Sequence, residues 1–326
     1  MQMTDELKML YQVARMYYED NLTQGQIASE LEINRVTVSR MLKKIREKGI
    51  VQIHINYDAY QNSGLALKLK EAYQLQDVVI VPDWPGQSEE NQLKELGQAG
   101  AKYLAERVKP EDIVGFSWGT ALAATVEALD SSTSLENVMC VPLIGGPDGE
   151  MESRYHANSI VYDAARKWKG FSKLIDVPAI VESADIRKSL TASAHFKEIE
   201  DLWERLSIAV VGIGSPLISD GTNWRAFYGP AFEGKGTKPE VAGDICSNFY
   251  TFSGEVLHTE LSKRTISVSM QHLQQAECTI GVAHSLRKKE AIRVALEAGF
   301  LDVLVTTEQT AKELMKVQET ERRDSK

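Results

Sequence analysis

Apolar residues in the first 57 positions recur with the spacing of amphipathic helices. Three helices are predicted, and they begin at the helix-capping residues Thr4, Thr23 and Asn34. Their inward-facing positions are Leu7, Leu10, Ala14 and Tyr17 in the first helix, Ile27, Ala28 and Leu31 in the second, and Val38, Leu42 and Ile45 in the third. The third helix is expected to run to about Lys48, where Gly49 ends it.

After Gly49 the pattern changes to strict alternation. Val51, Ile53 and Ile55 alternate with polar residues, which predicts a short, half-buried strand. Residues 1–57 are therefore predicted to form a winged helix-turn-helix domain, with three helices followed by a wing. The polar stretch 58–64 predicts a linker to the rest of the chain.

Residues 62–326 show a different pattern, in which short apolar runs alternate with amphipathic stretches. The predicted strands span 78–82, 112–117, 138–146, 208–216, 278–283 and 303–307. The predicted helices span 90–107, 121–129, 159–168, 196–206, 288–298 and 308–317. This order is typical of an α/β fold, here a Rossmann-like, mostly parallel, doubly wound sheet domain. Residues 244–257 predict a hairpin appended to that sheet, with Ser253 and Gly254 in its turn.

The composition excludes several classes of protein. The chain has 326 residues, 43% of them hydrophobic and 25% charged, which is enough to bury a sizeable core. No apolar run reaches ~18 residues and no signal peptide begins the chain, so neither a membrane segment nor secretion is expected. Three widely spaced cysteines, Cys140, Cys246 and Cys278, suit buried thiols in the cytoplasm. No histidine has a partner at metal-ligand spacing, and we expect neither a metal nor a cofactor.

The net charge of −9 hides a basic segment. Residues 1–57 hold eight Lys or Arg and seven Asp or Glu, whereas the remaining 269 residues carry a net −10. Within 34–48, six basic residues accompany one acidic residue. A phosphate backbone responds to charge within a Debye length, so this stretch keeps DNA as a candidate partner.

Two short helices joined by a tight turn, the second of them basic, are typical of a DNA-reading module, because the major groove admits one helix. A cap at Asn34 would direct free N–H groups at a phosphate. The residues expected to contact DNA are Asn34, Arg35, Thr37, Ser39, Arg40, Lys43 and Lys44. The alternative is a solvated helix in a small bundle, and the accompanying turn, cap and strand favour DNA binding.

Three glycine-bearing loops follow predicted strands, and each is a candidate ligand loop. Glycine lets the backbone approach a ligand, and a helix N-terminus offers donors to a phosphate. Ligands of open parallel sheets lie outside the carboxyl ends of the strands, so we expect one shared site. Its expected residues are Gly115, Ser117, Trp118, Gly119, Thr120, Gly145, Gly146, Gly212 and Gly214. The alternative is that these turns need glycine for geometry alone, and that Trp118 only packs.

The stretch LTQGQIASELEINRVTVSRMLKKIREKGIVQIHI strongly resembles the winged helix-turn-helix of the SorC family of bacterial sugar-responsive transcription regulators. The chain departs from the family pattern at Gln26, where Glu is usual, and at Asn34, where Ser is usual. Asn caps a helix as well as Ser does, so the second departure changes little.

The resemblance continues through GFSWGT, PLIGGPDG, HANSIVYDAARKW, GIGSP, AGDICSNFY and the segment from VAHSLRKKEAI to the C-terminal helix. It implies a sugar-phosphate-binding domain in which the GFSWGT loop and Lys288, or its neighbour Lys289, hold the phosphate. It also implies that Asp244 binds sugar hydroxyls and that the protein is a tetramer built from dimers. His284 and Ser285 stand where relatives commonly carry Gly-Gly, which would narrow the pocket.

The same superfamily includes sugar-phosphate isomerases and deaminases, so an enzyme fused to a DNA-binding domain is the alternative function. In the deaminases the glycine loop continues into Asp-Gly-His, whereas Ser215 and Pro216 follow Gly214 here. The ligand-binding loops are present without the Asp and His of the deaminase motif. This favours a sensor that has no catalytic residue. We therefore expect a regulator of a sugar-utilisation operon whose affinity for operator DNA is controlled by a phosphorylated sugar. One such domain touches little DNA, so a dimer or tetramer is expected, with Leu7, Tyr11 and 65–73 as candidate contacts.

Overall fold

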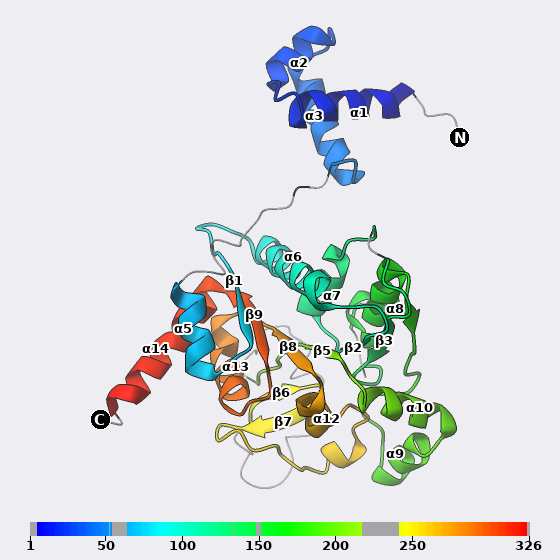
Figure 1. Ribbon diagram of the computed structural model, residues 1–326, viewed down its shortest axis with the longest axis vertical. Helices are drawn as coiled ribbons and strands as arrows, with labels where there is room; N and C mark the ends of the chain where they lie inside the picture. Colours follow the sequence, from blue (N-terminus) through cyan, green and yellow to red (C-terminus); the bar gives the residue numbers. More distant parts are fainter. Residues whose placement is uncertain are drawn as a thin grey trace. The chain divides into compact units, whose positions relative to one another are not determined.

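The computed structural model describes residues 5–51, 53, 64–132, 134–147, 151–216 and 241–324, with side chains as far as residue 317. The chain divides into two compact units, residues 1–56 and 57–326, which are described separately (Figure 1).

The N-terminal unit contains the three predicted helices, α1 (Asp5–Tyr18), α2 (Gln24–Glu30) and α3 (Arg35–Glu47). Helices α2 and α3 each begin at a side-chain cap. The Thr23 side chain accepts a hydrogen bond from the amide of Gln26, and the Asn34 side chain accepts one from the amide of Val36. The fully buried core residues come from all three helices and include Leu10, Val13, Ile27, Val38 and Ile45. Leu7, predicted to face inward, stays partly exposed. Most of the predicted wing, residues 52 and 54–57, lies outside the described residues.

The larger unit is built on a seven-stranded sheet with the strand order β1-β9-β8-β5-β2-β3-β4. Every pairing in this sheet is parallel. Its strands are β1 (Asp77–Val81), β2 (Ile113–Phe116), β3 (Met139–Pro142), β4 (Phe171–Ser172), β5 (Ile208–Val211), β8 (Cys278–Val282) and β9 (Val303–Thr307). The predicted parallel α/β domain is therefore confirmed.

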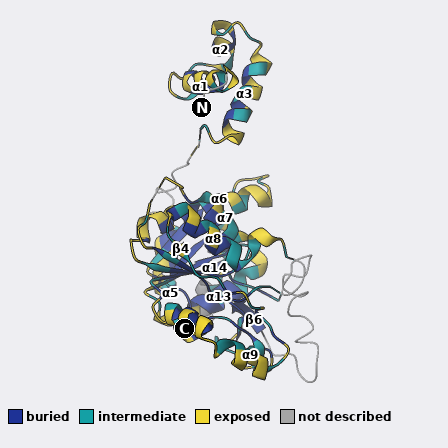
Figure 2. Ribbon diagram, turned by 90° about the vertical axis from the view of Figure 1, so that its right-hand side faces the viewer, coloured by how far each residue is buried: buried dark blue, intermediate teal, exposed yellow. Residues whose placement is uncertain are grey.

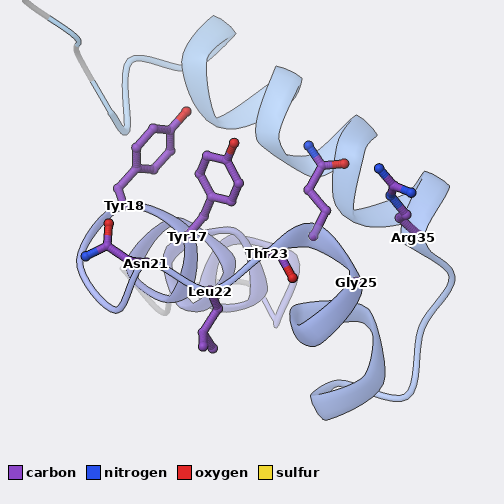
Figure 3. A pocket seen from close by; sticks show the side chains of 8 residues that line it. Tyr17, Tyr18, Asn21, Leu22, Thr23, Gly25 and Arg35 are labelled. Carbon is purple, nitrogen blue, oxygen red and sulfur yellow. The ribbon is translucent and has the colours of Figure 1, made fainter.

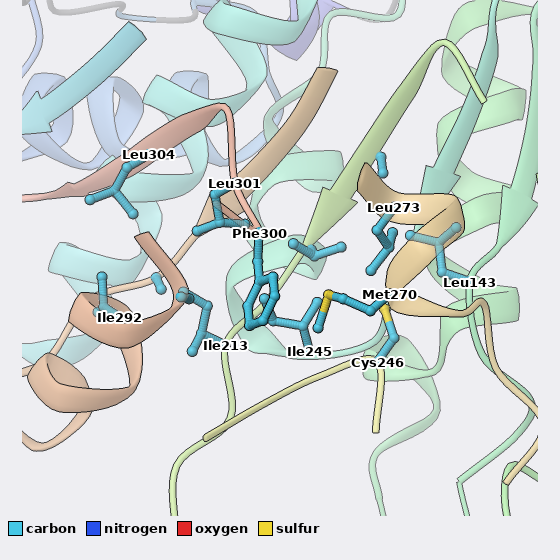
Figure 4. Close-up of a cluster of buried hydrophobic side chains, with 14 of the residues drawn as sticks. Leu143, Ile213, Ile245, Cys246, Met270, Leu273, Ile292, Phe300, Leu301 and Leu304 are labelled. Carbon is cyan, nitrogen blue, oxygen red and sulfur yellow. The ribbon is translucent and has the colours of Figure 1, made fainter. Parts of the chain in front are cut away.

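Helices cover both faces of the sheet (Figures 1 and 2). One face packs against α6 (Glu89–Arg107), α7 (Thr120–Ala128) and α8 (Ala157–Trp168). The other packs against α5 (Gly64–Tyr73), α10 (Ala194–Trp203), α12 (Met270–Gln275), α13 (Lys289–Glu297) and α14 (Glu308–Asp324). Figure 4 shows part of this second core, in which Phe300 and Met270 lie among branched aliphatic side chains. Helix α9 (Ala184–Thr191) precedes α10 and buries none of its own residues.

The predicted hairpin turn at Ser253-Gly254 is present, and a second turn that was not predicted precedes it. Strands β6 (Val241–Ile245) and β7 (Asn248–Thr251) pair antiparallel in a separate two-stranded sheet. The turn is Cys246-Ser247, at φ of 51° and 60°, a left-handed conformation that the sequence did not suggest because neither residue is Gly, Asn or Asp. Ser253 and Gly254 form the predicted turn, in which the Gly254 amide donates to the carbonyl of Thr251 and Tyr250 pairs antiparallel with Val256.

Strand β3 is also shorter than predicted. It ends at Pro142, and the following Gly145 and Gly146 leave the sheet to bond the segments around residues 177–179 and 266.

Candidate functional site

The outer surface of α3 presents the residues predicted to bind DNA. Val38, Leu42 and Ile45 face the core, and the basic side chains lie on the remaining sides of the helix. Asn34, Arg35, Ser39, Arg40 and Lys43 are exposed, whereas Thr37 and Lys44 are half-buried. The predicted residues thus share one accessible helix surface.

Asn34 has a local structural role in this helix. Its Oδ1 accepts a hydrogen bond from the Val36 amide at 2.8 Å, which satisfies one of the donors left free at the N-terminus of a helix. The cap fixes the first turn of α3, where Arg35 and Val36 lie.

Both lysines of α3 that were predicted to contact DNA have carboxylate partners. The Lys44 ammonium donates to Glu6 of α1, and this bond lowers the pKa of the Glu6 carboxyl. Lys43 lies 3.7 Å from Glu47 in an exposed pair one turn along the helix. Exposed pairs of this kind contribute little, so both lysines could exchange their partner for a phosphate at small cost.

A depression of about 730 Å³ lies beside the N-terminus of α3 (Figure 3). Tyr17 and Tyr18 project into it from the end of α1 with their rings edge to face, at a centroid distance of 4.9 Å. The other lining residues are Asn21, Leu22, Thr23, Gln24, Gly25 and Arg35. Except for Arg35, none of these residues was among those predicted to contact DNA. The periodicity assigned Tyr17 to the core, and the only available signal was that Tyr18, beside it, lies outside that apolar stripe.

In the second unit, the chain changes direction between β2 and β5. These strands are neighbours, but the chain continues from β2 to β3 on one side and from β5 to β8 on the other. Open α/β sheets bind ligands at such a switch point, outside the carboxyl ends of the strands. There Ser117, buried, accepts a hydrogen bond from the Gly212 amide at 3.1 Å. Two of the predicted loops therefore meet.

The β6–β7 hairpin brings Asp244 to the same strand ends. Gly214 and Asp244 exchange backbone hydrogen bonds of 2.9 and 3.2 Å. Close packing requires Gly243, since a Cβ there would lie 2.7 Å from Ala291 and 2.8 Å from the Gly214 carbonyl. The Asp244 carboxylate is 4% exposed and accepts from the Ser247 amide at 3.2 Å. It therefore caps its own turn as well as facing the strand ends.

Lys288 lies close to Asp244. Burial lowers the pKa of its ammonium, and the nearby Asp244 carboxylate opposes this shift. Lys289 lies nearer Glu313 of α14, where its charge contributes to lowering the pKa of that carboxyl. Of the two candidate lysines, Lys288 is thus the one beside the predicted sugar-binding carboxylate.

His284, which the resemblance placed at the pocket but not among its ligand-binding residues, adds an imidazole to this cluster. Burial, with the positive charge of Lys288 as a second cause, lowers its pKa to about 4. The histidine is therefore neutral at pH 7. Its place at the end of β8 was available from the sequence, but its proximity to Lys288 depends on the turn between them.

The GFSWGT loop enters α7 through an unusual backbone conformation. Gly119 has a φ of 125°, which favours glycine, and as N-cap it provides no side-chain acceptor for the first turn of α7. Thr120, the first residue of that helix, is exposed. The amide of Gly119 itself donates to the Tyr155 carbonyl at 3.0 Å. Trp118 packs partly buried between two small apolar clusters.

The remaining predicted glycines have structural partners. A Cβ on Gly115 would lie 2.4 Å from Leu143, so β2 needs glycine there for packing. The amides of Gly145 and Gly146 donate to the carbonyls of Ile266 and Val177. At Gly115, Gly145 and Gly146 these observations favour the alternative interpretation, in which glycine is required for packing and turn geometry.

Within the described ranges, no group of three or more His, Cys, Asp or Glu residues is arranged to hold a metal ion. Among the same residues, no helix is both long and apolar enough to cross a membrane.

Comparison with known proteins gives matches to both units. The family described as "Putative sugar-binding domain" matches residues 57–316, and the Crp-like helix-turn-helix domain family matches residues 7–58. The sorbitol operon regulator of Klebsiella pneumoniae is 44% identical over 316 residues, 97% of this chain and 100% of that protein. The deoxyribonucleoside regulator of Bacillus subtilis (strain 168) is 30% identical over 308 residues, 93% and 96% of the two chains.

The fold is shared with a solved regulator. The crystal structure of the full-length sorbitol operon regulator SorC from Klebsiella pneumoniae superposes with a TM-score of 0.79 and covers 96% of this chain and 100% of that one. A helix-turn-helix unit followed by a sugar-binding α/β domain defines a sugar-responsive transcription regulator. The chain belongs to the SorC family of such regulators, as its sequence motifs predicted.

Proposed function

We propose that the effector is a phosphorylated sugar and that it binds where β2, β5 and β8 end. The observation that carries this proposal is the proximity of the buried Asp244 carboxylate to the Lys288 ammonium at the switch point of the sheet. A lysine is a point charge suited to a phosphate, and a carboxylate accepts hydrogen bonds from several sugar hydroxyls. The α7 N-terminus, uncapped by any side chain, supplies further donors.

The regulated target in this proposal is an operator in front of genes for sugar utilisation, read in the cytoplasm. Support comes from the basic α3 surface and from relatives named for a sorbitol operon and for deoxyribonucleosides. Each helix-turn-helix reads one half-site, so the protein acts as a dimer or tetramer. Tyr11, half-exposed on α1, and Leu67, exposed on α5, are candidate contacts between copies.

In this proposal the protein binds its sugar phosphate without converting it. The Asp244 carboxylate already accepts from the Ser247 amide, which favours a fixed binding role over that of a mobile base. Incubation of the purified protein with each sugar phosphate that binds, followed by product analysis, distinguishes a sensor from an isomerase or deaminase. Accumulating product would favour the enzyme.

The test of the effector site begins with a screen. The full-length protein is heated with a panel of sugar phosphates, and a ligand at 100 times its Kd should stabilise the folded state by about 2.7 kcal/mol. Operator binding is then titrated at fixed salt with and without the best ligand.

The decisive variant is Lys288→Met, which keeps the apolar stem and removes the charge. Losing a charge-assisted contact costs about 1.5–3 kcal/mol, so the ligand should bind at least about tenfold more weakly while operator affinity without ligand is unchanged. Lys289→Met is the matched control and should respond like the wild type. A Lys288→Met protein with the full response would place the phosphate elsewhere.

A further inference from the structure

Val36 is an apolar side chain on the most exposed line of the recognition helix. It is 56% exposed, although it lies in the first turn of α3, one residue after Arg35. With 3.6 residues per turn, Val36 and Arg40 lie one above the other, on the side of α3 opposite the buried Val38 and Ile45. The outermost side chain near the N-terminus of α3 is thus a hydrocarbon beside a guanidinium.

The first turn of α3 also holds Val36 in a defined orientation. The Asn34 side chain accepts from the Val36 amide at 2.8 Å and fixes the backbone there. A β-branched side chain in a helix has one strongly preferred χ1 rotamer, so the two methyl groups are presented with little freedom to lose. A preordered apolar group is suited to a small apolar contact.

The major groove offers one such contact, the C5-methyl group of thymine. We propose that Val36 reads a thymine methyl in each half-site of the operator, next to the base contacted by Arg40. This inference rests on the proposed function, because it requires that α3 enter the major groove. Val36 would then determine specificity through an apolar contact, whereas the other residues predicted to contact DNA are polar or charged.

The test removes single methyl groups from the DNA. Duplexes are first selected by the full-length protein from a random pool, and each thymine of the recovered site is then replaced by deoxyuridine. At one thymine per half-site, this change should weaken wild-type binding about fourfold for each half-site altered, the effect of losing one buried methyl-sized group. Val36→Ala should bind the thymine duplex about as weakly as the wild type binds the duplex altered in both half-sites, and deoxyuridine should weaken it no further.

Arg40→Ala is the matched control. It should bind more weakly overall, yet deoxyuridine should still reduce its affinity, because Val36 and its contact with the methyl group are retained. Val36→Ala leaves α3 folded, because the side chain is exposed and alanine has the higher helix propensity.

Two results would overturn the inference while leaving DNA binding intact. One is a selected site in which no thymine-to-deoxyuridine change affects the wild type. The other is an equal deoxyuridine effect in wild type and Val36→Ala. Failure to select any duplex would instead overturn the proposed function, and the inference with it.

Discussion

Ser285 holds a backbone conformation that favours glycine. Its φ is 102°, a region that residues with a Cβ rarely adopt. Two bonds hold it there: its amide donates to Thr310 Oγ1 at 3.1 Å, and its Oγ accepts from the Arg287 amide at 3.3 Å. The geometry explains why glycine suits this position in relatives, and why serine can replace it here. The preceding residue, His284, lies at the edge of the proposed effector site.

The first prediction concerns His284 and pH. Its folded-state pKa of about 4 lies below the ordinary value of about 6.5, so the unfolded chain takes up a proton between these values and the folded chain does not. Stability should therefore fall as the pH drops through this window, by on the order of 2 kcal/mol at pH ~4.5. His284→Gln should lack this component. The measurement is urea unfolding of both proteins at pH ~6.5 and ~4.5.

The difference between the two proteins isolates His284, because all other titrating groups are shared. His284→Asn, a second variant without a titrating side chain, guards against a packing effect specific to glutamine. Equal loss of stability in all three proteins would contradict the assigned environment of His284.

At the scale of elements, α2 depends on its N-terminal cap. The helix has seven residues, too few to be stable by propensity alone. Thr23 Oγ1 accepts from the Gln26 amide at 3.3 Å, while Gln26 Oε1 accepts from the Thr23 amide at 2.9 Å. Gln26, one of the departures from the family pattern, thus performs the capping-box role usual for Glu.

The second prediction follows from this cap. Thr23→Ala should destabilise the N-terminal unit by about 0.5–2 kcal/mol, because the Gln26 amide loses its acceptor. Thr23→Ser keeps the hydroxyl and should remain within about 0.5 kcal/mol of the wild type. Hydrogen exchange of the α2 amides measures the change locally, without interference from the larger unit. Equal protection in Thr23→Ala and wild type would show that packing of Ile27 and Ala28 holds the helix unaided.

The hydrophobic periodicity predicted most helices and strands, because the positions that an element buries determine the spacing of its apolar residues. Strands such as Val303–Thr307 are buried at every position, and α3 shows a clear apolar stripe. The turn at Ser253-Gly254 was predicted because it contains glycine, whereas the β6–β7 turn was missed because Cys246 and Ser247 adopt left-handed conformations that their propensities do not reveal. The proximity of Asp244 to Lys288 also depends on strand order, which a single sequence does not fix.

At the scale of the whole molecule, the two units differ in charge. The basic surface of α3 belongs to a unit of nearly balanced charge, whereas the rest of the chain is strongly acidic. An acidic domain repels the phosphate backbone, so DNA affinity depends on the first unit. The effector acts on the second unit, so it can change DNA binding only by favouring one arrangement of the protein over another.

The third prediction is the reciprocity of this coupling. If a sugar phosphate changes operator affinity by some factor, operator DNA must change sugar-phosphate affinity by the same factor, commonly between about 5 and 150. Both factors can be measured on one preparation, by titrating operator with saturating ligand and ligand with saturating operator. Sedimentation under the same conditions gives the number of copies in each state, which we expect to be two or four.

The variants Lys288→Met and Arg40→Ala test ligand binding and operator binding separately. Lys288→Met should weaken binding of the sugar phosphate, so both titrations require a higher ligand concentration. The factor by which ligand changes operator affinity must still equal the factor by which operator changes ligand affinity. Arg40→Ala weakens the operator and leaves ligand binding to the free protein unchanged. Factors that disagree in the wild type would mean that the two titrations follow different assemblies. A monomer with and without DNA would remove the interface through which the units of separate copies could be coupled, and the switch would then have to act within one chain.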